Sequence, residues 1–469
     1  MPRLTFSLLA GVLLLSGCAA VPDLAPGPEL RSGTDLLSTE SLKGGNADWP
    51  ADQWWTAYGD PQLNQIVDEA LAGSPTLAET SARLKSAQAR ADMAAGGTLP
   101  SLSANGQVAQ TKQSYNAGFP KLFVPKGYKE FGRASLDFGY DLDLWGRNRA
   151  ALAAATSEAR AAQADAAQSR LILTTTLVSA YADLARISGE IAAAEASARN
   201  RDASSELVQR QMANGVANRG EAQQAKAASA AARGELASLQ EQASLARNRI
   251  SALMGAGPDR GLKLSPPLAQ AGTSAGLPDK VEINLVGRRP DLTAARLRAE
   301  AASRRIDVAR AGFYPNINIA AFLGLQSLGL DALTQAGSDI GQAGLALSLP
   351  IFEGGRIRAG YKGARADYDA AVAAYNQALV LALKDVADAA VSERSLSVQL
   401  AAARESLSAG EAAYRIARLR YEGGLSSYLV LLTAENTVIA QRRAVAQLEA
   451  RALSLDASMV RALGGGFRS

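Results

Sequence analysis

The chain has 469 residues, no histidine and a single cysteine. Without histidine it can hold no Ser-His-Asp relay and no imidazole metal ligand, and one cysteine cannot form an intramolecular disulfide. The net charge is only +4, with 49 basic and 45 acidic residues interspersed, which does not indicate a nucleic-acid partner. No HExxH or Walker pattern occurs either. We therefore expect no catalytic residue, no metal and no cofactor.

The amino-terminal residues predict an exported lipoprotein. A basic residue precedes an apolar stretch at 4–15, which is shorter than a transmembrane helix, and small residues lead directly to Cys18. This pattern resembles a bacterial lipobox, in which residues 1–17 are removed and Cys18 is acylated. An ordinary signal peptide that happens to contain a cysteine is the alternative. Ala19 follows in place of aspartate, which favours the outer membrane, and residues 18–58 are expected to form a lipidated tether.

The remainder of the chain is predicted to be one unit repeated twice. Landmarks recur in the same order, among them Gly97-Thr98-Leu99-Pro100 with Gly312-Phe313-Tyr314-Pro315, and Gly146-Arg147-Asn148-Arg149 with Gly355-Arg356-Ile357-Arg358. The predicted parts are a first helix–strand–strand–helix repeat at 59–255, an equatorial linker at 256–278, a second such repeat at 279–463 and a tail at 464–469.

Long helices are expected on both sides of the short alternating segments. The helical pattern at 149–213 contains no proline, and about 65 residues would make a helix roughly 100 Å long. Its return partner at 219–254 would cover only about 55 Å, and the helix at 290–311 about 33 Å. Two short helices stacked end to end would nearly match one long helix. We therefore predict that 219–254 stacks on 290–311, and that 75–95 stacks on 428–463.

Four short segments alternate with a period of two, which predicts strands. They are 101–108, 134–144, 317–323 and 343–349, each close to the span of a tilted transmembrane strand. A half-buried sheet of a water-soluble protein has the same alternation. The aromatic residues of the 111–133 connection resemble a loop at a membrane interface and favour the membrane.

In the segment 134–144 the even positions are apolar, while the odd positions include Asp137, Asp141 and Asp143. These carboxylates are predicted to line a water-filled interior, as a solvated face more than as a selectivity filter. Four strands cannot close a barrel with a lumen, since the smallest such barrels have eight. Chains must therefore pool strands, eight in a dimer or twelve in a trimer, and the strand count leaves both open.

Several further motifs of the chain are characteristic of one family. They are Leu142-Asp143-Leu144-Trp145-Gly146-Arg147, Gly312-Phe313-Tyr314-Pro315, Leu349-Pro350-Ile351-Phe352-Glu353-Gly354-Gly355-Arg356 and Ala462-Leu463-Gly464-Gly465-Gly466. With the lipobox and the duplicated unit, they make residues 50–466 resemble the TolC-type outer membrane efflux proteins. The resemblance is strongest to the lipoprotein branch (NodT-type) that serves RND multidrug pumps.

The resemblance implies a mainly α fold with a membrane β-barrel. A long α-helical periplasmic barrel and four transmembrane strands per chain would close as a 12-stranded barrel in a homotrimer. The protein would lie in the outer membrane of a Gram-negative bacterium, held by its lipid anchor, with a periplasmic adaptor and an inner-membrane pump of RND type as partners. It would be a passive conduit that exports small molecules. A duct for type I protein secretion stays the alternative, whereas a periplasmic coiled-coil spacer would not explain the strands.

Prolines and glycines are assigned to places where the chain must change direction. Proline ends a helix and favours an extended predecessor, and glycine tolerates the left-handed backbone of a turn. The predicted helix–strand transitions are at Pro100, Pro315, Gly146, Gly354 and Gly355, and the predicted periplasmic tip turns, which would contact the adaptor, are at Gly215 and Gly424.

The resemblance also places a periplasmic constriction near the second tip. By position, Tyr421 matches a tyrosine of the family pattern, Leu429 a constricting leucine, and Glu221 an acidic residue of the first tip. Thr433 stands where the family usually has an acidic residue, which puts cation selectivity at the constriction in doubt. Ordinary packing at the tips is the alternative for Leu429 and Tyr421.

Overall fold

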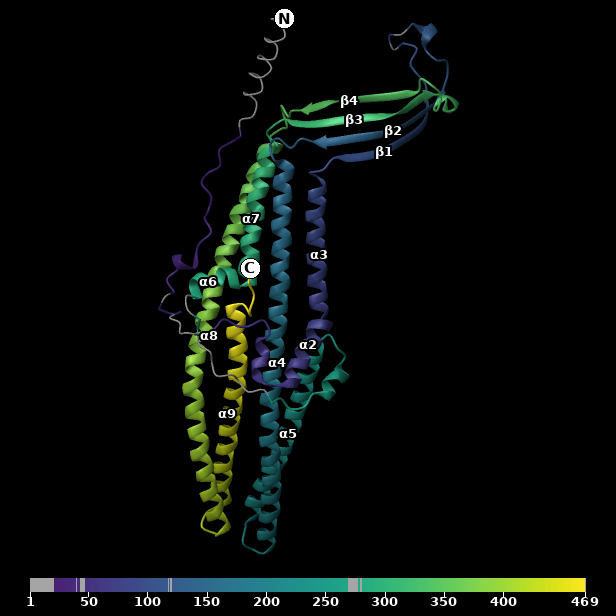
Figure 1. The fold of residues 1–469 in the computed structure, drawn as a ribbon. Helices are drawn as coiled ribbons and strands as arrows, with labels where there is room; N and C mark the ends of the chain where they lie inside the picture. The colour runs from purple at the N-terminus through teal and green to yellow at the C-terminus, as the bar shows by residue number, and fades with distance from the viewer. Residues whose placement is uncertain are drawn as a thin grey trace. The chain divides into compact units, whose positions relative to one another are not determined.

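The computed structural model describes residues 21–38, 40–42, 47–116, 118, 120–268, 277–278 and 281–468 (Figure 1). The predicted signal peptide and the predicted lipidation site, Cys18, lie outside the described residues. Within the described ranges, none of the helices combines the length and the apolar character that crossing a membrane would need.

The element order repeats across the two halves of the chain. The first half contains η1 (Gly33–Asp35), η2 (Trp54–Tyr58), α2 (Pro61–Gly73), α3 (Pro75–Gly96), β1 (Ser101–Thr111), η3 (Lys121–Phe123), β2 (Lys129–Asp141), α4 (Arg147–Ala213) and α5 (Arg219–Leu253). The second contains η4 (Pro258–Lys263), α6 (Val281–Arg288), α7 (Pro290–Ala311), β3 (Asn316–Leu328), η5 (Leu330–Ala332), β4 (Asp339–Ser348), α8 (Arg356–Glu422) and α9 (Tyr428–Leu463). A mainly helical chain with an internal duplication and one antiparallel sheet is thus confirmed.

The four strands form one antiparallel sheet in the order β1-β2-β3-β4 (Figure 1). Its register places apolar side chains side by side. Phe138 of β2 lies between Leu102 of β1 and Ala321 of β3, and Leu136 lies next to Leu323. Because alternate residues of a strand point to opposite faces, these side chains share one apolar face. The predicted alternation is therefore present in the strands.

The prediction that the strand continues to residue 144 is wrong, because β2 ends at Asp141. Asp143 has a positive φ of 46°, and its carboxylate accepts hydrogen bonds from the backbone amides of Asn148 and Arg149 at 2.9 and 3.0 Å. Aspartate tolerates left-handed backbone and satisfies free amides at the start of a helix better than most residues. Asp143 therefore caps α4 and does not belong to the water-facing stripe of the strand.

Contacts divide the chain into two compact units, and each unit takes residues from both repeats. Unit 1 combines the described part of Met1–Glu29 with Lys85–Ala161 and Arg296–Ala374, and unit 2 combines Leu30–Leu84, Ala162–Ala295 and Tyr375–Ser469. Unit 1 contains the sheet, and unit 2 contains the three hydrophobic clusters.

The core of unit 2 is built on the apolar stripe of α4. Leu177, Tyr181 and Leu184, spaced by three or four residues, are fully buried against α2 and neighbouring helices. The Tyr181 hydroxyl donates to the carboxylate of Asp60 at 2.7 Å, and this carboxylate also accepts from the amide of Gln62 at the start of α2. The stripe thus fixes the position of α2 as well as filling the core.

The predicted end-to-end stacking of helices is paired wrongly. A Cβ at Gly255, just after α5, would collide with the backbone of Gly73, just before α3. A Cβ at Gly464, just after α9, would collide with the backbone of Arg288, just before α7. Stacking therefore joins α5 to α3 and α9 to α7, within each repeat. Helix lengths alone allow either pairing, but only this one brings these chain ends into contact.

Candidate functional site

The consecutive helices α4 and α5 form a first helical hairpin, and α8 and α9 form a second. The turns at the ends of the two hairpins are built in the same way. Gly215 follows α4 with a φ of 74°, and Gly424 follows α8 with a φ of 72°. The amide of the next residue, Val216 or Leu425, donates to the carbonyl five residues earlier at 2.8 Å in both turns. This is the hydrogen-bond pattern by which glycine ends a helix in left-handed backbone. The glycines singled out from the sequence thus lie at both turns, while their contact with an adaptor stays a prediction.

Tyr421 connects the two hairpins beside the turns. Its hydroxyl donates to the side-chain carbonyl of Gln211 on α4 at 2.9 Å, and its ring lies 5.8 Å from that of Tyr428. Burial raises the pKa of Tyr421, and the nearby Glu221 carboxylate raises it further. Glu221 itself accepts from the amide of Asn218 at 3.1 Å, and the Asn218 side chain accepts from the amide of Glu221. Glu221 therefore forms a capping box at the start of α5.

Leu429 and Thr433 do not take part in the packing of the tips. Leu429 is 56% exposed, although the next buried position of α9, Leu431, is 7% exposed. Thr433 is also exposed, and its hydroxyl donates to the Leu429 carbonyl at 2.8 Å. Residues four apart lie on the same side of a helix. These two side chains therefore share a face of α9 that the chain itself leaves uncovered.

A buried ion pair farther along the hairpins escaped sequence reasoning. The Arg201 guanidinium on α4 lies 3.4 Å from the Glu435 carboxylate on α9, and the two side chains are 10% and 11% exposed. Arg201 also donates to the Asn436 side chain at 2.5 Å. Burial raises the pKa of Glu435, and the charge of Arg201 counteracts this effect. Charges scattered along amphipathic helices carry no signal in the sequence that would pair these two residues.

The helix–strand transitions occur at the residues predicted from the sequence. Pro100 directly precedes β1, and Pro315 directly precedes β3. On the return to helix, Gly146 has a φ of 72° before α4, and Gly354 and Gly355 have φ values of 57° and 87° before α8. Such angles favour glycine because a Cβ would be strained there.

The transition into α4 is held by several polar contacts. Burial by itself would raise the pKa of Asp143, but hydrogen bonds from the amides of Asn148 and Arg149 outweigh it, and the pKa is lowered. The Arg149 guanidinium lies 3.3 Å from the same carboxylate. The carboxylate is therefore kept charged at the start of the helix, where its charge is favourable.

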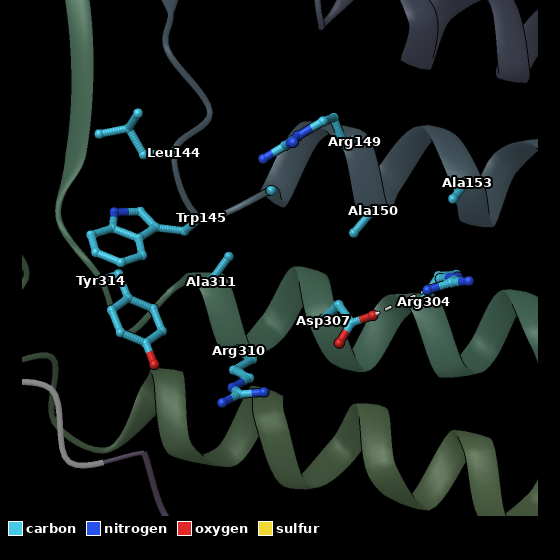
Figure 2. Close-up of a pocket in the computed structure, with 11 residues that line it drawn as sticks. Leu144, Trp145, Arg149, Ala150, Ala153, Arg304, Asp307, Arg310, Ala311 and Tyr314 are labelled. Atoms are coloured by element: carbon cyan, nitrogen blue, oxygen red, sulfur yellow. Dashed lines mark ion pairs between the residues drawn. The ribbon is translucent and has the colours of Figure 1, made fainter.

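A pocket lies between the start of α4 and the end of α7 (Figure 2). Trp145 and Tyr314 form one of its ends, with their rings stacked at 4.6 Å and an interplanar angle of 16°. The Trp145 indole donates to the Pro315 carbonyl at 2.7 Å, which fixes the ring. The pocket has a volume of about 530 Å³, and Arg149 and Arg310 lie among its lining residues. Sequence reasoning identified Trp145 and Tyr314 only as parts of motifs characteristic of the family.

The fold and these motifs agree with comparisons to known proteins. The model of the "Outer membrane efflux protein" family matches residues 66–256 and 284–465, which are most of both repeats. The chain belongs to this family. It is 31% identical over 472 residues to the multidrug resistance outer membrane protein MdtP of Shigella flexneri, covering 99% of the chain and 96% of the relative. It is 29% identical to the pyoverdine export outer membrane protein OpmQ of Pseudomonas aeruginosa, with 99% and 97% covered.

A solved structure supports the same assignment. The outer membrane protein VceC of Vibrio cholerae matches with a TM-score of 0.84 and 40% identity, over 90% of the chain and all of VceC. This chain is thus an outer membrane channel protein. Its family is one of channel and transport proteins. In the described part of the chain, no group of three or more Asp, Glu, His or Cys side chains could hold a metal ion.

Proposed function

We propose that this efflux family member is the outer membrane exit duct of a tripartite system that exports small toxic molecules. The observation that carries the proposal is the likeness over nearly the whole chain to MdtP, a protein named for multidrug resistance. A periplasmic adaptor and an inner-membrane pump, of RND type, would deliver the cargo, and three copies of the chain would form the duct.

The sheet supports assembly into a larger structure. In the described chain, β1 and β4 are the outer strands of the sheet, so each has one edge without a neighbouring strand. Free strand edges readily pair with other chains. Three copies would join these edges and pool twelve strands into a closed barrel, with the apolar faces of Leu136 and Phe138 toward lipid.

The exposed face of α9 is the proposed constriction. Leu429 and Thr433 lie uncovered on one side of the helix, so three copies would bring three such faces together around an axis. Glu221 of the first hairpin and Tyr421 of the second, which bonds to the first hairpin, would position the tip. Because Thr433 carries no charge, we expect the constriction to show little preference for cations. The glycine turns at Gly215 and Gly424 are proposed as the adaptor contacts.

Conductance of the purified protein in planar lipid bilayers tests the constriction. Leu429→Ala should raise the single-channel conductance because it removes side-chain volume from the narrowest place. Val430→Ala is the matched control. Val430 is 52% exposed on the same helix, but its side chain points about 100° away from that of Leu429. An equal effect of both variants, or no effect of Leu429→Ala, would assign Leu429 to packing.

Export is tested in a Gram-negative strain that lacks its own efflux outlet. Expression of the chain with a cognate pump and adaptor should lower the intracellular accumulation of a fluorescent dye. Secretion of a protein substrate without any change in dye accumulation would support a type I secretion duct instead. Cross-linking of detergent-purified protein should stop at three chains, and a dominant dimer would contradict the trimer.

The lipid anchor is a separate proposal with its own test. Cells that express the wild-type chain should incorporate radioactive palmitate into it, and Cys18→Ser should abolish the label. Labelling that persists in the variant would contradict lipidation at Cys18.

A further inference from the structure

The pocket between α4 and α7 combines two aromatic side chains with arginines at matched positions (Figure 2). Arg149 follows Trp145 by four residues, and Arg310 precedes Tyr314 by four residues. Arg149 lies in the first turn of α4, just after Trp145, and Arg310 lies in the last turn of α7, just before Tyr314. The stacked rings lie at the end toward the strands, and the guanidinium groups follow on the helix side.

The charges of the pocket are only partly neutralised. Arg304 lies 3.8 Å from Asp307, and Arg149 lies 3.3 Å from Asp143. The Arg310 guanidinium has no hydrogen-bond or ion-pair partner within the described part of the chain. Three guanidinium groups thus face two carboxylates, and the Arg149 side chain is 70% exposed although Asp143 orients it. The pocket offers an oriented guanidinium and an uncommitted one to an anion.

The location of the pocket indicates where that anion would come from. In the proposed function, on which this inference rests, the sheet crosses the outer membrane. Large apolar side chains follow the strand ends and stay exposed: Leu144 at 57%, Ile351 at 85% and Phe352 at 89%. Exposed apolar residues beside stacked Trp and Tyr rings are typical of the boundary between hydrocarbon and headgroups. Arg149 and Arg310, in the adjoining ends of α4 and α7, would lie at the depth of the phosphate groups.

We infer that this pocket binds the headgroup of an anionic phospholipid from the periplasmic leaflet of the outer membrane. The guanidinium groups of Arg149 and Arg310 hold the phosphate, since a guanidinium fork matches phosphate oxygens in charge and geometry. The stacked Trp145 and Tyr314 rings contact the glycerol and the first acyl carbons. A zwitterionic headgroup brings its own cation to the same place and binds less well. The bound lipid holds the start of α4 and the end of α7 at the membrane surface.

Native mass spectrometry of the full-length protein in detergent tests the inference. The protein is titrated with phosphatidylglycerol and, separately, with phosphatidylcholine of the same acyl chains. The test variant is Arg149→Gln/Arg310→Gln. The matched control is Arg160→Gln/Arg296→Gln, which removes two exposed arginines from the same two helices at least three turns farther from the strands.

The wild type should bind phosphatidylglycerol more tightly than phosphatidylcholine. The test variant should lose about 25-fold in apparent affinity for phosphatidylglycerol, from about fivefold for each basic residue at an anionic surface. The control variant should stay within about twofold of the wild type. Equal binding of the two lipids by the wild type, or an equal loss in both variants, would overturn the inference. Displacement of the lipid by excess inorganic phosphate would assign the site to free anions and would also overturn it.

Bilayer conductance separates this inference from the proposed function. The test variant should conduct like the wild type, because neither arginine belongs to the proposed constriction. Normal conductance without selective lipid binding would remove only the lipid site. A wild-type protein that forms no channel would contradict the proposed function.

Discussion

Replacing Asp143 by alanine is expected to open the first turn of α4. The carboxylate accepts from the amides of Asn148 and Arg149 at 2.9 and 3.0 Å, so both amides lose their partner in the variant. Loss of a helix cap costs about 1–2 kcal/mol. Alanine must also adopt the positive φ of 46°, which adds about 1 kcal/mol because aspartate tolerates this backbone better. The expected local destabilisation is about 2–3 kcal/mol.

Hydrogen exchange followed by mass spectrometry measures this change on a peptide that covers the start of α4. Local opening that is easier by 2–3 kcal/mol should speed exchange roughly 30- to 150-fold, since each 1.4 kcal/mol is a factor of ten. Asp143→Asn is the matched comparison. Its amide oxygen still accepts one bond and asparagine tolerates left-handed backbone, so the effect should stay below about 1 kcal/mol, or about fivefold. Exchange within twofold of the wild type in Asp143→Ala would refute the capping role.

Three further changes test the helical packing. Gly464→Ala should lower the melting temperature strongly, because its Cβ would meet the backbone just before α7 and its φ is 93°. Gly257→Ala, with nothing near its Cβ, should have little effect. Glu435→Ala should lower the free energy of unfolding by about 3–5 kcal/mol, because the Arg201 charge stays buried without its acidic partner. A chemical-denaturation midpoint equal to that of the wild type would contradict this. The pKa of Glu69 is lowered from 4.5 chiefly by the hydrogen bond from Arg260 on η4. This contact therefore stabilises the fold above pH 4.5, and the stabilisation is lost as the pH falls through the lowered pKa. The difference in melting temperature between wild type and Glu69→Gln should accordingly be present at pH 7 and shrink in acid, and a constant difference would argue against the ion pair.

Elements with a strong local signal could be predicted from the sequence. The stripe of Leu177, Tyr181 and Leu184 predicted a long helix with one buried face, because periodicity and burial follow from the same geometry. Pro100 and Gly215 predicted the ends of elements, since each restricts or permits a particular backbone. Repetition of such landmarks also predicted the duplicated order of elements. These inferences needed only neighbours within a few residues.

The end of β2 shows the limit of a local pattern. Alternation continues through Leu142 and Leu144, so the pattern gave no reason to end the strand at Asp141. The strand ends where Asp143 turns to cap α4, and this depends on where the helix begins in space. A carboxylate that lines a face and one that caps a helix look alike in a period-two pattern.

The sequence by itself determined the helices, the strands, the turns and the order in which they repeat, because each follows from contacts within a segment. Only the tertiary structure decided that α5 meets α3, that Arg201 meets Glu435 across 234 positions of sequence, and that Trp145 stacks on Tyr314 in a pocket also lined by arginines. These pairings join residues far apart in the chain whose local patterns are compatible with many partners. Their identity depends on how whole helices pack, which no single segment specifies.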